Sequence, residues 1–314
     1  MSGGGETRVA VIGGGQNCEH DVSLASAASV AAGLASAYDV VPLTIGRDGT
    51  WHDGRRVPMG LADAVRVLGR CDVAFPMVHG PRGEDGALAA LCELAGVPYV
   101  GSGIRPGAIA MDKWATKLVA AECGIATARG RLVTRGTRDL RWTGPVVVKP
   151  VAAGSSQGVS LAGTAADLEP AVESAFALDD RVLVEEVVQG REIDVAVLRR
   201  ADGSVLAAPA LEIVVPGLFD YEAKYGGHAD FRLPADIDDV EAKALEDAAL
   251  AVFDALGCAG VARIDFFLTD GGPVLNEVNT VPGMTEHSQV PRMFAAAGLS
   301  YPDLLDELVR AALP

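Results

Sequence analysis

Acidic side chains lie inside a strongly apolar segment that runs from Gly260 to Asn279. Its pattern predicts two strands joined by a turn over Thr269–Pro273. Asp265 lies on the first strand, while Glu277 and Asn279 are two residues apart on the second and therefore share one face. Such oxygen ligands are too few to satisfy a cation alone, so they suit Mg²⁺ that is shared with a polyphosphate.

A solvated hairpin whose polar residues face outward is the alternative interpretation of this segment. The neighbours of Arg263, Asp265 and Glu277 argue against it, because they are apolar and indicate burial. Buried charges are costly unless they are paired or bound to a metal. The segment therefore favours a set of paired charges or a metal site. The apolar neighbours are Val261, Ile264, Phe266, Leu275 and Val278.

A lysine followed by a loop of small residues is the second signal. Lys149 is near the end of an expected strand over 145–150, and the loop Ala153-Gly-Ser-Ser-Gln-Gly158 follows it. Small residues let backbone N–H groups approach phosphate oxygens, and the lysine supplies a positive charge. The order differs from the G-x-x-x-x-G-K-[ST] loop, because here the lysine precedes the glycines. A surface loop with an ordinary exposed lysine is the alternative.

The glycine-rich turn Gly13–Gly15 follows a short apolar strand. Cys18 stands where the third glycine of a G-x-G-x-x-G fingerprint belongs, which disfavours NAD binding. The alternative is a turn that presents Glu19 to a ligand.

Two more segments have polar residues that need an explanation. Glu185 and Glu186 are adjacent on an expected strand, so they point to opposite faces and at least one of them needs a partner. An adenine amino group or a ribose hydroxyl would serve, and an exposed strand end is the alternative. The loop around Tyr221–Tyr225 has neither strand nor helix periodicity, which is typical of a lid or of a solvated loop.

The composition is that of an ordinary globular protein, with 314 residues, 49% hydrophobic and 22% charged. The net charge of −16 argues against a nucleic-acid partner, which needs a basic surface, but not against a nucleotide. The five cysteines are odd in number and widely spaced, which favours a reducing compartment. We find no apolar signal region and no long apolar run, so we expect a cytoplasmic protein without a membrane partner.

Alternating strands and helices predict an α/β (α+β) protein with three units, 1–102, 103–188 and 189–314. The first unit alternates as in a Rossmann-like parallel sheet with ligand-facing loops at its strand ends. The chain ends in a helix that Ser300 is expected to cap. The expected strands cover 8–12, 40–45, 73–78, 145–150, 182–188, 194–198 and 206–215, and the other expected helices cover 23–37, 61–68, 103–120 and 237–256.

Seven motifs, in order along nearly the whole chain, resemble those of the D-alanine–D-alanine ligase family of the ATP-grasp superfamily. The resemblance implies an ATP-grasp fold with a substrate-binding domain over 1–102, a lid subdomain over 103–188 and a catalytic domain over 189–314. The motifs are Glu19–Ser23, His79-Gly80 with Gly83–Gly86, Met111–Lys113, Lys149-Pro150 with Gly154–Ser156, Glu222–Tyr225, Arg263–Asp265 and Asn276–Met284.

The resemblance also implies which residues hold the nucleotide and its metal ions. The expected cofactors are ATP and two Mg²⁺ ions, with Mn²⁺ as a substitute. The phosphate contacts would come from Lys113, Lys149 and Lys224, the adenine–ribose pocket from Glu185, Glu186 and Glu192, and the metal ligands from Asp265, Glu277 and Asn279. Ser156 is a further expected nucleotide-binding residue.

The amino-acid substrates are assigned by the same resemblance. Glu19 would receive the ammonium group of the first D-alanine beside His79, and Ser288 would bind the carboxylate of the second. The oxyanion site would consist of Arg263 and the Gly283 backbone amide, and the network that ties the lid over the substrate would consist of Glu19, Ser155 and Tyr225.

The implied function is ATP-dependent ligation of two D-alanines through an acyl phosphate, for peptidoglycan precursors, by a cytoplasmic homodimer. An alternative is a related ligase or cyclo-ligase that acts on another D-amino acid in secondary metabolism or self-resistance. A non-catalytic nucleotide-binding module is disfavoured, because the lysines and metal ligands are all intact.

The sequence departs from the family pattern on the acceptor side. Gln289 replaces a usually apolar residue next to Ser288. The stretch Gly226–Pro234 lacks the motif of a polar residue followed by Cys-Pro-Ala that typical members have. Both leave the identity of the second substrate open. If the acceptor is D-alanine, the Gln289 amide must turn to solvent or to protein, whereas a polar acceptor such as D-serine would bind it.

Overall fold

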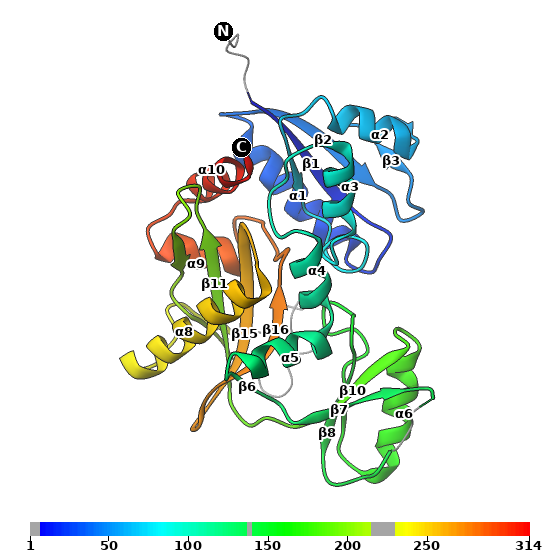
Figure 1. The fold of residues 1–314 in the computed structure, drawn as a ribbon, viewed down its shortest axis with the longest axis vertical. Coiled ribbons are helices and arrows are strands. Elements are labelled where there is room, and N and C mark those ends of the chain that lie inside the picture. Colours follow the sequence, from blue (N-terminus) through cyan, green and yellow to red (C-terminus); the bar gives the residue numbers. More distant parts are fainter. Residues whose placement is uncertain (1–6, 137–139, 215–229) are drawn as a thin grey trace.

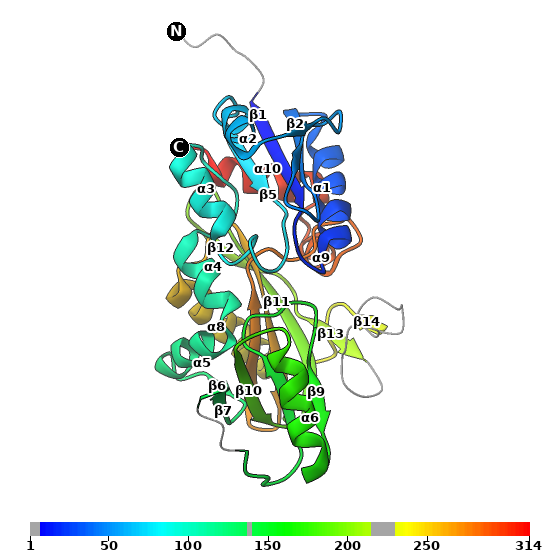
Figure 2. The same cartoon turned by 90° about the vertical axis from the view of Figure 1, so that its right-hand side faces the viewer.

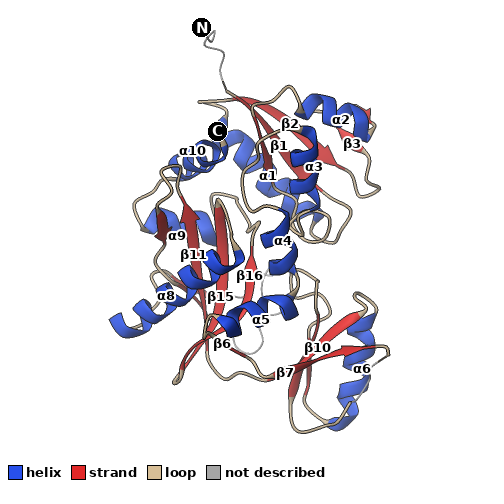
Figure 3. Cartoon of the chain, in the orientation of Figure 1, coloured by secondary structure: helices blue, strands red, loops and turns tan. Residues whose placement is uncertain are grey.

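The structure is a computed structural model that describes residues 7–136, 140–214 and 230–314. Within these residues the strands form three sheets, with helices packed against each of them (Figure 1, Figure 3). In Figure 1 the N-terminal sheet lies at the top, the C-terminal sheet in the middle and the central sheet at the lower right. This mixed architecture confirms the predicted α/β fold class. No helix in the described part of the chain is long and apolar enough to cross a membrane.

The N-terminal sheet has five strands in the order β4-β3-β2-β1-β5. The first strand pairs in parallel with both β2 and β5, which confirms the predicted parallel arrangement, while the two short edge strands are antiparallel. The strands are β1 (Arg8–Gly14), β2 (Asp39–Ile45), β3 (Trp51–His52), β4 (Pro58–Met59) and β5 (Val73–Pro76), and the helices are α1 (His20–Leu34), α2 (Leu61–Leu68) and α3 (Ala87–Ala95).

Strand β1 is buried on both faces because helices cover both sides of this sheet. Val9 and Val11 pack with α1 and with the C-terminal helix α10 (Tyr301–Ala312), whereas Ala10 and Ile12 pack with α2 and α3. The alternation follows from the two-residue period of a strand. Its carboxyl end therefore opens directly into the loop that carries Glu19.

The central sheet is antiparallel, in the order β7-β10-β8-β9. One helix, α6 (Ala165–Phe176), covers one face and begins with a capping box between Thr164 and Asp167. Helix α6 was not predicted from the sequence; it contains Pro170, a residue that removes a helical hydrogen bond. The strands are β7 (Gly130–Thr134), β8 (Val146–Pro150), β9 (Ser160–Ala162) and β10 (Arg181–Glu186).

The C-terminal sheet has seven strands, with the path β14-β13-β11-β15-β16-β6 and β12 paired to β11. The strands are β6 (Ala126–Thr127), β11 (Arg191–Arg199), β12 (Val205–Ala207), β13 (Leu211–Val214), β14 (Asp230–Arg232), β15 (Val261–Thr269) and β16 (Gly272–Asn279). The helices that pack on it are α4 (Ile104–Met111), α5 (Lys113–Glu122), α8 (Asp239–Leu256) and α9 (Gln289–Ala296).

Several predicted elements differ from the structure at identifiable residues. The helix expected over 103–120 is two helices, because Asp112 ends α4 and its side chain accepts the Ala115 N–H to begin α5. The strand expected over 206–215 is two strands separated by a segment that contains Pro209, which cannot donate to a sheet. The hairpin β15–β16 and the Ser300 cap of α10 are confirmed.

Helices α4 and α5 belong spatially to the C-terminal sheet. Both lie with α8 along one face of it, as Figures 2 and 3 show, and Ala110 and Ala120 join the same core as Leu245 and Phe253. The proposed division at 102, 188 and 189 stays a prediction, but α4 and α5 have their core contacts with α8 and β16 of the C-terminal unit.

Candidate active site

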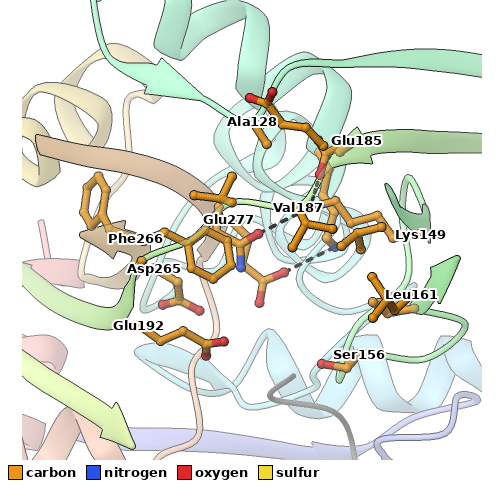
Figure 4. A pocket seen from close by; sticks show the side chains of 18 of the residues that line it. Ala128, Lys149, Ser156, Leu161, Glu185, Val187, Glu192, Asp265, Phe266 and Glu277 are labelled. Atoms are coloured by element: carbon orange, nitrogen blue, oxygen red, sulfur yellow. Dashed lines mark hydrogen bonds and ion pairs between the residues drawn. The ribbon is translucent and has the colours of Figure 1, made fainter. Parts of the chain in front are cut away.

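Two cavities meet at the β15–β16 hairpin. The larger one has a volume of about 500 Å³ and lies between the central and C-terminal sheets (Figure 4). The smaller one has a volume of about 240 Å³ and lies where the N-terminal and C-terminal units meet. Asp265 and Glu277 line the larger cavity, whereas Arg263 and Asn279 line the smaller one.

The predicted hairpin residues are brought together. In the antiparallel register Asp265 lies opposite Glu277, and Arg263 lies opposite Asn279. Arg263 donates from Nε and Nη2 to the two Asp265 oxygens at 2.7 Å each, and Asn279 Nδ2 donates to Asp265 Oδ2 at 3.0 Å. Burial alone lowers the pKa of the Arg263 guanidinium, but Asp265 and Asp194 offset this and hold the pKa well above its ordinary value.

The donor set at this hairpin fits a magnesium ion. Asp265, Glu277 and Asn279 offer two carboxylates and one amide oxygen, which are the hard ligands that Mg²⁺ prefers. In the described residues there is no cluster of three or more His, Cys, Asp or Glu side chains that holds a metal alone. A cation here would therefore take further ligands from water or from a bound phosphate.

Lys149 on β8 and Lys113 at the start of α5 both line the larger cavity. Lys149 Nζ lies 2.6 Å from Glu185 Oε2 and donates to Asn276 Oδ1 at 3.3 Å. Lys113 Nζ donates to the carbonyl of Ala153 at 2.9 Å and lies 3.4 Å from Glu277 Oε2. Two cations in one cavity suit a polyphosphate.

Lys117 was not predicted as a site residue; it follows Lys113 by one helical turn and therefore points the same way. Its Nζ lies 2.5 Å from Glu185 Oε1, so the buried Glu185 carboxylate is held between two lysines. Burial raises the pKa of Glu185, but Lys149 and Lys117 outweigh it and lower the pKa below its usual value. Burial lowers the pKa of Lys117.

The three glutamates predicted for the nucleotide pocket all line the larger cavity. Glu185 is buried and turned toward Lys149, as Figure 4 shows, while Glu186 is exposed and accepts the Arg129 backbone N–H at 3.0 Å. Glu192 lies near Asp265 in the same view, and Ser156 lines the cavity from the loop after β8. Lys224 lies outside the described residues.

Glu19 and Ser155 meet across the smaller cavity. Ser155 Oγ donates a short hydrogen bond to Glu19 Oε1, which joins the loop after β1 to the loop after β8. Glu19 Oε2 is buried, and among the described residues it has no hydrogen-bond partner. Ser155 has φ +49 and Ser156 has φ +54, so a left-handed turn carries both side chains. Tyr225, the third member of the predicted network, lies outside the described residues.

His79 lines the smaller cavity but has two partners already. Its Nδ1 lies 2.7 Å from the Val281 carbonyl and its Nε2 lies 3.1 Å from Ser26 Oγ, so the ring ties the N-terminal unit to the segment after β16. Glu84 lines the same cavity and was missed as a site residue, although it lies within a recognised motif. Burial and the nearby Glu19 carboxylate raise the pKa of Glu84 to about 8.

The acceptor side is formed by the start of α9. Ser288 Oγ accepts the Thr285 backbone N–H at 3.1 Å, and Ser288 and Gly283 line the smaller cavity together. Gln289 turns to protein: Arg263 Nη1 donates to its Oε1 at 2.7 Å, and its Nε2 donates to Asp194 Oδ2 at 3.0 Å. The sequence analysis placed Asp194 at the start of a strand but did not assign it to the site.

Comparison with known proteins is consistent with this geometry. A model of the D-ala D-ala ligase C-terminus matches residues 135–310, and a model of the D-ala D-ala ligase N-terminus matches residues 8–68 and 57–102. The chain is 39% identical over 355 residues to a D-alanine–D-alanine ligase of Mycolicibacterium vanbaalenii, with 98% of this chain and 97% of that protein covered.

Two solved structures show the same fold. The VanG D-Ala:D-Ser ligase from Enterococcus faecalis has a TM-score of 0.88 at 33% identity, covering 98% of this chain and 100% of that chain. The D-alanine–D-alanine ligase from Bacillus anthracis, solved in complex with ATP, has a TM-score of 0.81 at 28% identity, covering 98% and 97%. These similarities confirm the predicted ATP-grasp architecture.

Proposed function

The chain belongs to the D-alanine–D-alanine ligase family, and from this premise we propose that it joins two D-alanine molecules with ATP. The products are D-alanyl-D-alanine, ADP and phosphate, and the dipeptide would serve as a peptidoglycan precursor. The environment of the Glu19 carboxylate is the main support for this proposal. Ser155 donates to one carboxylate oxygen, and the other is buried in the smaller cavity without a partner among the described residues. A buried acceptor of this kind matches a substrate ammonium group.

The larger cavity is proposed to bind ATP. Its volume suits a drug-sized ligand, and Lys113 and Lys149 supply positive charge where the phosphates would lie. Binding of ATP by the B. anthracis relative supports the assignment. Asp265, Glu277 and Asn279 would hold Mg²⁺, which neutralises phosphate charge when bound. A second Mg²⁺ ion, a homodimer and a cytoplasmic location remain expectations from the family.

The chemistry follows from the position of Arg263 where the two cavities meet. The carboxylate of the first D-alanine attacks the γ-phosphorus of ATP, and ADP leaves, which yields an acyl phosphate. The amine of the second D-alanine then attacks that carbonyl carbon, and phosphate leaves with one former carboxylate oxygen. Arg263 and the Gly283 backbone N–H are proposed to stabilise the negative oxygen of the tetrahedral intermediate.

D-Alanine is the proposed acceptor because Gln289 offers its amide to protein groups. Its oxygen accepts from Arg263 and its nitrogen donates one N–H to Asp194, so the amide oxygen and one of the two N–H groups bond to protein. A site that selects a hydroxyl gains its preference from a polar group directed at the substrate. The alternative acceptor is D-serine, which the similarity to the VanG D-Ala:D-Ser ligase favours.

Competition between acceptors tests the proposal. The purified protein is incubated with ATP, Mg²⁺ and equal concentrations of D-alanine and D-serine, and the dipeptides are separated by mass. We expect D-alanyl-D-alanine to dominate, with one ADP formed per dipeptide. A mixed dipeptide as the main product would overturn the acceptor, and ATP turnover without any dipeptide would overturn the ligase assignment.

A further inference from the structure

Arg263, Asp194 and Gln289 form a closed ring of polar contacts beside the hairpin. Arg263 Nη1 donates to Gln289 Oε1 at 2.7 Å, and Gln289 Nε2 donates to Asp194 Oδ2 at 3.0 Å. The ring closes because the same Asp194 oxygen lies 3.3 Å from Arg263 Nε. We call these three residues the arginine ring.

The ring joins three elements that are distant in sequence. Asp194 lies on β11, Arg263 on the neighbouring β15, and Gln289 is the first residue of α9. Asp194 and Asp265 are paired in the antiparallel register, so two carboxylates face one guanidinium. Asp194 is 2% and Arg263 6% exposed, so water does little to screen these charges. The guanidinium is therefore held from two sides by charge and from a third by an amide.

These contacts use three of the N–H donors of the Arg263 guanidinium. A guanidinium has five N–H groups, one on Nε and two on each Nη. Asp265 takes the N–H of Nε and one of Nη2, and Gln289 takes one of Nη1. Among the residues that the structure describes, one N–H then remains on each Nη atom, and Arg263 lines the smaller cavity. Donors lower a barrier most when they are oriented before the charge develops.

We propose that Asp194 and Gln289 act together as positioning residues, which fix the Arg263 guanidinium so that its remaining N–H groups point at the reacting carbonyl. The inference rests on the proposed function, because it gives Arg263 its role in the second step. Gln289 suits this task because one amide both accepts from Arg263 and donates to Asp194. Leucine at this position would do neither, and glutamate would place a carboxylate against Asp194.

An exchange of the two groups tests the pair. The variants are Asp194→Asn, Gln289→Glu and the double variant that carries both changes. The first leaves two amides in the ring and the second leaves two carboxylates, while the double variant restores one of each in reversed positions. Asp247→Asn, which removes an exposed aspartate on α8, is the matched control.

The measurements separate positioning from folding and from nucleotide binding. They are kcat, KM for ATP, the temperature of unfolding and the number of dipeptides formed per ADP. We expect each single variant to lower kcat by about ten- to a hundredfold, as small misplacements of catalytic groups do, with KM for ATP within about twofold of wild type. Fewer dipeptides per ADP should form, because a slowly consumed acyl phosphate is lost to water. The double variant should recover most of kcat.

Three outcomes would overturn the inference. The first is that the single variants keep the wild-type kcat and the wild-type number of dipeptides per ADP. The second is that the two losses in kcat multiply in the double variant, and the third is a defect confined to KM for ATP. If Gln289→Glu fails to fold, the isosteric Asp194→Asn still tests the inference through the number of dipeptides that it forms per ADP. Wild type that makes no dipeptide would instead overturn the proposed function, which distinguishes the two failures.

Discussion

Glu84 is the residue whose ionisation should control the pH dependence of stability. Its pKa is about 8 in the folded protein and 4.5 in an unperturbed chain, because the half-buried carboxyl is desolvated and lies near Glu19. Between these pH values the folded protein holds a proton that the unfolded chain has lost. Stability therefore falls as pH rises through this window, by at most about 1.4 kcal/mol per pH unit for this group, and levels off above pH 8.

Replacing Glu84 with Gln should remove this contribution. Denaturant unfolding at pH 5.5 and pH 8.5, without nucleotide or Mg²⁺, should show a smaller loss of stability in Glu84→Gln than in wild type. The exposed Glu246→Gln serves as the control and should keep the wild-type difference. Equal pH dependence in wild type and Glu84→Gln would contradict the assignment of a neutral Glu84 carboxyl.

Gly154 tests how tightly the loop after β8 packs on Glu19. A Cβ atom at this glycine would lie 2.3 Å from Glu19 Oε2, so the carboxylate that Ser155 holds must shift. Gly154→Ala should raise KM for the first D-alanine at least tenfold, because its ammonium site is displaced. Gly163→Ala is the matched control, since its nearest heavy atom would be 4.0 Å away. Steady-state kinetics at varied D-alanine measure this KM. An equal KM in Gly154→Ala and Gly163→Ala would contradict the proposed ammonium site.

At the scale of elements, the sequence predicted the hairpin well and the helices less well. The β15–β16 pair was predictable because acids alternate with apolar residues at strand period around a glycine-rich turn. The end of α4 at Asp112 was not predictable, because the residue that caps α5 resembles an ordinary polar residue inside a longer helix. Helix α6 was missed for a similar reason, since Pro170 argues locally against it while its packing on the central sheet stabilises it.

The hairpin should bind Mg²⁺ through Asp265 and Glu277 only in the presence of nucleotide. Asp265→Asn and Glu277→Gln each remove one negative charge from the set of metal ligands. In both variants the gain in ATP affinity that Mg²⁺ produces should be at least tenfold smaller than in wild type. Calorimetric titration of ATP at several Mg²⁺ concentrations measures this without turnover. Asp270→Asn, in the hairpin turn, is the control. Wild-type Mg²⁺ dependence in both site variants would contradict the metal assignment.

At the scale of the whole molecule, the site exists only because three units converge. Glu19 comes from the N-terminal unit, Ser155 from the central sheet and Arg263 from the C-terminal sheet. Sequence motifs predicted each residue, but their mutual distances depend on long-range packing. Helix α10 illustrates this: its Asp306 accepts a hydrogen bond from Tyr38 at the other end of the chain, so the last helix completes the first core.

The arginine ring shows the limit of reasoning from motifs. Gln289 was recognised as unusual, but its partner Asp194 lies 95 residues earlier and has no motif of its own. A polar residue inside a buried strand was the available signal, and it did not identify a partner. Only the packing of α9 on β11 brings the two side chains together.

The transfer of a labelled oxygen atom tests the central claim most directly. D-Alanine that carries ¹⁸O in its carboxylate is incubated with the protein, unlabelled ATP and Mg²⁺, and the released phosphate is analysed by mass. The acyl-phosphate route predicts that one carboxylate oxygen leaves with the phosphate in each turnover, so the phosphate should carry one ¹⁸O atom per dipeptide formed. Dipeptide formation with unlabelled phosphate would contradict the route.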